Sequence, residues 1–115
     1  MCELAEKAEA IWNEDVRDSL DLSVKIIEGT IEAWEAENFT RQLDEFTSNW
    51  ILESESACRE HYFDKTTPAE AYREQAACFE DLLQQCRDII ESMRGGAHGA
   101  MDRSSALEDA LESCL

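Results

Sequence analysis

The sequence predicts an all-α fold, an up-down antiparallel bundle of three long helices and a shorter fourth. Helix breakers are rare, because the chain has one proline and three of its four glycines fall within residues 95–99. Ala, Glu, Leu, Gln and Arg, which favour helices, dominate the composition, whereas the β-branched residues that favour strands are sparse. Apolar side chains also recur at steps of three and four residues, which is the spacing of one helical face.

The first predicted helix covers residues 3–28. Its apolar side chains would share one face, with charged side chains on the opposite face, as in an amphipathic helix. This apolar stripe consists of Leu4, Ala8, Ile11, Trp12, Val16, Leu20, Val24 and Ile27. Gly29 follows at the position where a residue in the left-handed conformation commonly ends a helix.

The second predicted helix runs from residue 31 to residue 63. Its apolar stripe consists of Ile31, Trp34, Leu43, Phe46, Trp50 and Ala57. The spacing of apolar residues is irregular over residues 37–40, so we expect a kink or a break there.

Pro68 marks the start of the third predicted helix, because proline is favoured in a first turn. The apolar residues that follow alternate steps of four and three, the most regular pattern in the chain. They are Tyr72, Ala76, Phe79, Leu83, Cys86, Ile90 and Met93. The glycines of residues 95–99 end this helix, and a short fourth helix is predicted over residues 101–114.

A chain of 115 residues is long enough for a single hydrophobic core, so residues 1–115 are predicted to form one domain. The short connections make successive helices antiparallel. Large apolar residues from the first three helices are expected to form the core. The predicted core residues are Trp12, Trp34, Phe46, Trp50, Phe79, Leu83 and Ile90.

The chain is strongly acidic, with 27 acidic residues against ten basic ones and a formal net charge of −17. Phosphate groups repel such a surface, so we expect no direct binding of nucleic acid or of anionic lipid. No stretch approaches the roughly 18 apolar residues of a membrane span, so no membrane insertion by this segment is expected. The carboxylates are spread along the chain, which favours a solvated surface. The alternative is a negative face that binds a basic partner.

The five cysteines suggest a disulfide between the second and third helices. Cys58 and Cys78 each lie ten residues from the single proline, so antiparallel packing brings them to a similar level. A Cys58–Cys78 disulfide is the first expectation, and a Cys86–Cys114 disulfide between the third and fourth helices is the second. Cys2 would be left over. The alternative is that all five are reduced, and most are small apolar core residues.

No motif indicates catalysis or a bound metal or cofactor. Cys58 and His61 lie one helical turn apart, but a structural zinc site requires four ligands and normally shows two such pairs. A Cys–His nucleophile would also need a third residue to orient the histidine. We therefore expect no enzyme activity, no catalytic residues, no metal site and no cofactor.

The segment from Trp34 onward contains a recognisable order of residues. It consists of Leu43-Asp44-Glu45-Phe46, Trp50, Glu55-Ser56-Ala57-Cys58, Tyr72-Arg73-Glu74-Gln75-Ala76-Ala77-Cys78-Phe79 and Leu82-Leu83. This order resembles the helical region between the membrane helix and the tetratricopeptide repeats of bacterial receptor-type serine/threonine protein kinases. The resemblance implies a sensor or spacer region, with phosphoryl transfer outside this chain, because the sequence has none of the kinase nucleotide-binding and catalytic motifs.

These observations favour a non-catalytic helical signalling module that binds a protein partner or self-associates. One alternative is a stand-alone acidic inhibitor that mimics nucleic acid and binds a basic protein. Another is a structural homodimeric bundle. The kinase resemblance implies an extracytoplasmic position, and a cytoplasmic one is expected otherwise. A disulfide would be more natural outside the cytoplasm.

Overall fold

The computed structural model describes residues 2–96 and 99–115, and within these residues it contains helices and no strands. The all-α prediction is therefore confirmed. The helices are α1 (Ala5–Ile11), α2 (Glu14–Ser19), α3 (Leu22–Ile27), α4 (Ala33–Tyr62), α5 (Ala69–Arg94), α6 (Gly99–Ser104) and α7 (Leu107–Glu112). The molecule is elongated, with principal extents of 53, 23 and 19 Å.

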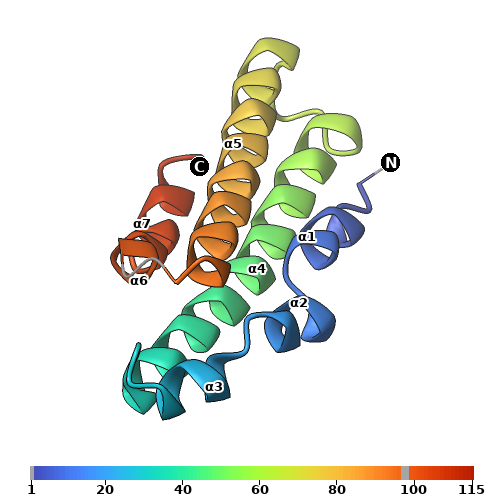
Figure 1. The fold of residues 1–115 in the computed structure, drawn as a ribbon. Coiled ribbons are helices and arrows are strands. Elements are labelled where there is room, and N and C mark those ends of the chain that lie inside the picture. The colour runs from blue at the N-terminus through green and yellow to red at the C-terminus, as the bar shows by residue number, and fades with distance from the viewer. Residues whose placement is uncertain (1, 97–98) are drawn as a thin grey trace.

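Two long helices, α4 and α5, form an antiparallel hairpin that runs through the molecule (Figure 1). The rings of Trp50 and Phe79 meet edge to face between them, with centroids 6.2 Å apart. Trp50 Nε1 also donates a hydrogen bond of 2.9 Å to the Phe79 carbonyl oxygen. A buried aromatic pair with a satisfied indole N–H holds the two helices in one register.

The other helices lie along this hairpin. The chain descends through α1, α2 and α3 in the view of Figure 1, ascends in α4, descends in α5 and returns through α6 and α7. α1 packs against both long helices, as do α6 and α7, while α3 packs against α4. Figure 1 shows that α3 and the start of α4 form the lower end of the molecule in this view.

The predicted first long helix is wrong, because residues 3–28 form three short helices. The Asn13 side chain accepts a hydrogen bond of 2.8 Å from the Val16 N–H and caps α2. Asp21 adopts the left-handed conformation with φ of 50° immediately before α3. Asn and Asp offer the backbone local hydrogen bonds and tolerate the left-handed region, so they interrupt a helix whose apolar spacing is otherwise continuous.

The break predicted as one possibility at residues 37–40 is absent, because α4 is one uninterrupted helix of 30 residues. Its buried face includes Ala36, Phe39, Leu43, Phe46 and Trp50, at steps of three and four. Ala36 and Phe39 make the apolar stripe continuous through residues 37–40. The fourth predicted helix is divided as well, with α6 ending at Ser104 and α7 beginning at Leu107.

Six of the seven predicted core residues are buried, and Trp34 is the exception. The buried residues are Trp12, Phe46, Trp50, Phe79, Leu83 and Ile90. The side chain of Trp34 is 63% exposed. Two residues correspond to about 200° of rotation along a helix, so Trp34 faces away from the buried stripe that begins at Ala36. The prediction that Trp34 belongs to the core is therefore wrong.

Candidate interaction surface

Two disulfides join cysteines in pairs that differ from the prediction. Cys2 is bonded to Cys58 and Cys78 is bonded to Cys114, with a Cα–Cα distance of 5.6 Å in each pair. Cys86 is a free buried thiol. The predicted Cys58–Cys78 and Cys86–Cys114 disulfides are therefore wrong, as is the expectation that Cys2 is left over.

Cys58 and Cys78 lie to the side of the contact between the two long helices and therefore do not face one another. Trp50 and Phe79 mark that contact. Consecutive helical residues are separated by about 100°, so Cys78 is rotated by about that angle from its neighbour Phe79. Cys58 follows Trp50 by eight residues, which rotates it by about 80°. Each cysteine therefore meets a cysteine from one end of the chain.

Both end segments are covalently attached to the α4–α5 hairpin as a result. The Cys2–Cys58 bond attaches the segment before α1 to α4, and the Leu4 N–H donates a hydrogen bond of 2.9 Å to Glu55 Oε2 beside it. The Cys78–Cys114 bond attaches the segment after α7 to α5. These bonds reduce the freedom of both ends in the unfolded chain more than in the folded chain.

Cys58 and His61, one helical turn apart, do not form a thiol–imidazole pair. Cys58 is in a disulfide. His61 Nδ1 lies 2.8 Å from the carbonyl oxygen of Thr67, to which it donates, and the His61 ring stacks on Tyr72 with centroids 4.6 Å apart. Burial raises the pKa of the Cys86 thiol to about 12. Among the described residues no three His, Cys, Asp or Glu side chains are grouped as metal ligands would be.

An open groove of about 470 Å³ lies between α3 and the first half of α4. We call it the α3–α4 groove; its lining residues are Leu22, Ser23, Ile26, Ala33, Ala36, Glu37, Thr40, Arg41 and Asp44. Small residues on α4 keep the groove open, because Ala33 and Ala36 present only methyl groups to α3. Leu22 and Ile26 contribute apolar surface from the opposite side. The α3–α4 groove is therefore open to solvent and has apolar side chains on both of its walls.

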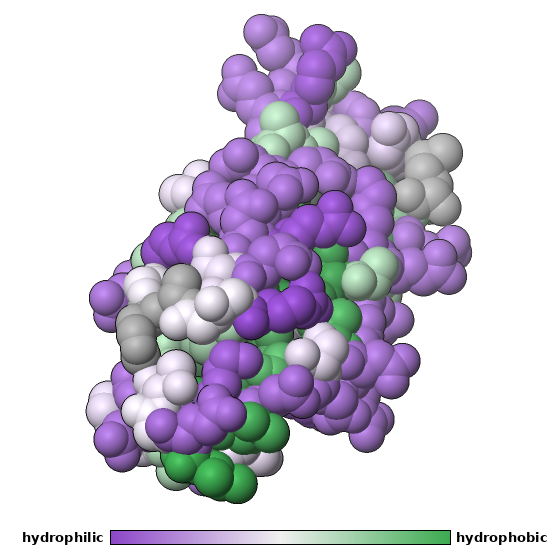
Figure 2. Space-filling model, viewed as in Figure 1, coloured by the Kyte–Doolittle hydropathy of each residue, from purple (hydrophilic) through white to green (hydrophobic). Residues whose placement is uncertain are grey.

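Two exposed apolar side chains on α3 lie outside the lining of this groove. Val24 and Ile27, one turn apart on α3, are 47% and 84% exposed. Figure 2 shows hydrophobic surface gathered at the lower end of the view, where Figure 1 places α3 and the start of α4, while most of the rest of this face is hydrophilic. Single exposed apolar residues are ordinary, but exposed apolar side chains on the same short helix that walls an apolar groove are typical of a binding surface.

Unpaired acidic groups surround the same end of the molecule. Residues 21–45 contain seven acidic residues and two basic ones. Lys25 donates to the Leu20 carbonyl oxygen, and Arg41 lies 4.0 Å from Glu45, so both basic side chains are engaged within the chain. Glu28 and Glu37 are exposed and have no ion pair or hydrogen-bonded side-chain partner among the described residues. The charged side chains of this end of the chain are therefore predominantly acidic.

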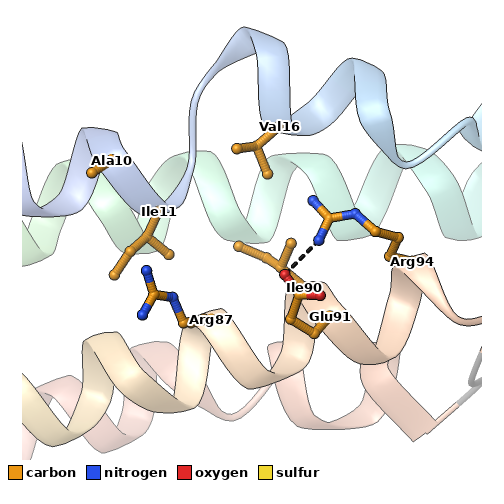
Figure 3. A pocket seen from close by; sticks show the side chains of 7 residues that line it. All are labelled: Ala10, Ile11, Val16, Arg87, Ile90, Glu91 and Arg94. Carbon is orange, nitrogen blue, oxygen red and sulfur yellow. Dashed lines mark hydrogen bonds and ion pairs between the residues drawn. The ribbon is translucent and has the colours of Figure 1, made fainter.

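A second, smaller pocket of about 110 Å³ lies between α5 and the helices α1 and α2 (Figure 3). Ile11, Val16 and Ile90 provide its apolar lining. Arg94 is paired with Glu91 within α5 and also donates a hydrogen bond of 3.0 Å to Ser19 Oγ. Ligand pockets usually exceed about 300 Å³. The arrangement in Figure 3 is thus suited to holding α2 against α5 rather than to binding a ligand.

Sequence reasoning placed no site at the α3–α4 groove. The apolar spacing predicts that Val24 and Ile27 lie on the buried stripe of one long helix, whereas both are exposed on α3. Asp21 is the residue in the sequence that could have indicated a break before α3. It adopts the left-handed conformation, which Asp tolerates, and it separates α3 from the preceding helix. The disulfide partners of Cys58 and Cys78 could not be predicted, because Cys2 and Cys114 lie near the chain ends. Apolar spacing there does not indicate which helix an end segment packs against.

Comparison of the chain with protein-family models, curated proteins and solved structures returned no match. No helix in the described ranges is both long and apolar enough to cross a bilayer.

Proposed function

We propose that this chain is a non-catalytic helical module that binds a protein partner through its α3–α4 end. The observation that carries the proposal is an open groove lined by Leu22, Ile26 and Ala33, on whose α3 wall Val24 and Ile27 are also exposed. Burial of such apolar surface against a partner removes it from water and contributes favourably to the free energy of binding. A flat or grooved surface that is open to solvent suits a macromolecule better than an enclosed small ligand.

The proposed setting is the extracytoplasmic part of a signalling receptor, as the resemblance to bacterial receptor-type serine/threonine kinases implies. Two disulfides support this setting, because such bonds persist in oxidising compartments and are rare in the cytosol. In this proposal the disulfides hold both ends of the chain against the hairpin, while the α3–α4 end, distant from them, contacts the partner. Phosphoryl transfer would belong to another part of the receptor.

A second candidate is an acidic inhibitor that binds a basic protein in place of nucleic acid. The net charge of −17 supports it, because most carboxylates have no basic partner within the chain: the described residues form four ion pairs. Salt distinguishes the two candidates. A complex built on charge alone weakens steeply with added salt, whereas a complex built on the apolar groove retains most of its affinity.

Site-specific photo-crosslinking tests the leading proposal. A photoreactive amino acid replaces Ile27, and in a matched control it replaces Leu52, which is also exposed and apolar but lies in the middle of α4. In cells that produce the protein, we expect a defined protein adduct from position 27 and none from position 52. Equal adducts from both positions, or none from position 27, would contradict the proposal. Sedimentation at twice the monomer mass would instead support the homodimeric bundle.

A further inference from the structure

The partner segment that fits the α3–α4 groove can be specified by its shape and charge. Resting on the function proposed above, we infer that the groove binds an amphipathic helix of a partner protein, one with an apolar stripe flanked by lysine or arginine. The inference combines the length of the groove, its apolar lining and the charge of its surroundings.

The length of the groove matches a short helix. Along α4 the lining runs from Ala33 to Asp44, which is about 16 Å at 1.5 Å per residue. Helices that bind in grooves insert side chains at positions i, i+4 and i+7, which span about 10 Å. Two to three turns of a partner helix therefore fit along the wall that α4 provides.

The chemistry of the lining favours apolar side chains in the groove and a polar face outside it. Leu22 and Ile26 are only partly buried against α4, so an inserted Leu or Ile would complete their burial. Ala33 and Thr40 are small enough to admit such side chains from above. This is the arrangement in which apolar anchors supply most of the binding free energy.

The charge around the groove selects basic residues beside the apolar stripe. Glu37 lines the groove and has no ion-pair partner among the described residues, while Asp44 accepts a hydrogen bond of 2.7 Å from Trp12 Nε1. The only basic residue in the lining, Arg41, is paired with Glu45. A second copy of this chain would bring a further charge of −17 to the groove, so electrostatics disfavour it as the occupant.

Three synthetic helical peptides of equal length test the inference against the full chain by fluorescence anisotropy. The first has a leucine stripe flanked by lysines, the second has the same stripe flanked by glutamates, and the third has the first composition in scrambled order. We expect the first peptide to bind and the other two to bind at least about tenfold more weakly, because only the first matches both the lining and the charge.

Variants of α4 locate the binding. Thr40→Trp fills the groove and should weaken the first peptide by about tenfold or more, whereas Ser48→Trp, exposed on the same helix, should leave binding unchanged. Glu37→Lys should weaken it by about threefold to fivefold. Glu60→Lys makes the same charge change at the other end of α4 and should have a smaller effect.

The outcomes separate this inference from the proposed function. Equal binding of the lysine-flanked and glutamate-flanked peptides would overturn the claim that the partner helix is basic. Equal binding of the first peptide and its scrambled version would overturn the claim that an apolar stripe anchors the helix. If no peptide binds while the crosslink from position 27 persists, the inference fails and the proposed function stands. If the chain self-associates and Thr40→Trp abolishes that self-association, a second copy of the chain occupies the groove and the inference is overturned.

Discussion

Two tryptophans on α4 show that the face a side chain occupies decides its contribution to stability. Trp50 is 1% exposed and its indole N–H donates to the Phe79 carbonyl oxygen, whereas Trp34 is 63% exposed. Both residues belong to an apolar spacing in the sequence, and both are in the same helix. Burial and a satisfied polar group distinguish them, and neither property is visible in the spacing alone.

The first prediction compares Trp50→Phe with Trp34→Phe. Trp50→Phe removes a buried hydrogen bond and leaves a gap between α4 and α5, so we expect the free energy of unfolding to fall by about 1–3 kcal/mol. Trp34→Phe changes an exposed side chain and should alter it by less than about 0.5 kcal/mol. Urea unfolding of both variants measures the difference. Similar losses for the two would contradict the burial described here.

The second prediction concerns the single free thiol, Cys86. Burial raises its pKa to about 12, so the thiol stays protonated at neutral pH and is also out of reach of reagents. Iodoacetamide at pH 8 should leave the native protein unlabelled by intact mass. In denaturant without reductant it should add one label, because the other four cysteines are in disulfides. Labelling of the native protein, or more than one label in denaturant, would contradict the assignment of Cys86 as a buried thiol and of the other four cysteines to disulfides.

At the scale of elements, the two long helices are stable because each buries a continuous apolar face, whereas the terminal helices are short and depend on attachment. α1, α2, α3, α6 and α7 have six or seven residues each. Helices of that length are marginal in isolation, so tertiary contacts must supply their stability. The disulfides of Cys2 and Cys114 keep the two end segments close to those contacts.

The third prediction is the loss of stability when these disulfides are removed. In the chain-entropy estimate, loops of 56 and 36 residues give each bond a contribution of about 4 kcal/mol. We expect Cys2→Ser with Cys58→Ala, or Cys78→Ala with Cys114→Ser, to lower the free energy of unfolding by an amount of that order. Cys86→Ala, which keeps both bonds, is the control and should cost much less. Peptide mapping that finds Cys58 bonded to Cys78 would contradict the pairing.

At the scale of the whole molecule, charge opposes compaction. The chain carries a formal charge of −17, and in all four ion pairs of the described residues both side chains are more than a third exposed. Such exposed pairs contribute little. Repulsion among the remaining carboxylates therefore acts over the full surface and is reduced only by counterions.

The fourth prediction follows from this repulsion. Raising the concentration of sodium chloride from about 10 mM to about 200 mM shortens the screening length from about 30 Å to less than 10 Å, so the melting temperature should rise. A variant with Glu37→Gln and Glu60→Gln carries less negative charge and should melt higher at low salt, with a shallower dependence on salt. Scanning calorimetry measures both. A melting temperature that stays flat or falls with salt would contradict the prediction.

Much of the fold could be predicted from the sequence by itself. The rarity of breakers and the period of the apolar residues determined that the chain is helical, where the hairpin turns at Pro68, and that α5 runs between the proline and the glycines. Periodicity succeeds there because a buried helical face requires apolar residues at that spacing whatever the rest of the molecule does. It also located six of the seven predicted core residues.

The pairing of the cysteines and the exposure of Val24 and Ile27 depend on how the helices pack. Cys58 and Cys78 were expected at a similar level, yet each lies to the side of the Trp50–Phe79 contact and meets a cysteine from one end of the chain. Which faces of the two long helices meet is settled by packing, and sequence spacing alone does not specify it. Val24 and Ile27 became exposed because Asp21 ends the preceding turn and redirects α3. The candidate surface therefore exists because a local break changed the direction of an apolar stripe, and that direction depends on contacts between segments distant in the chain.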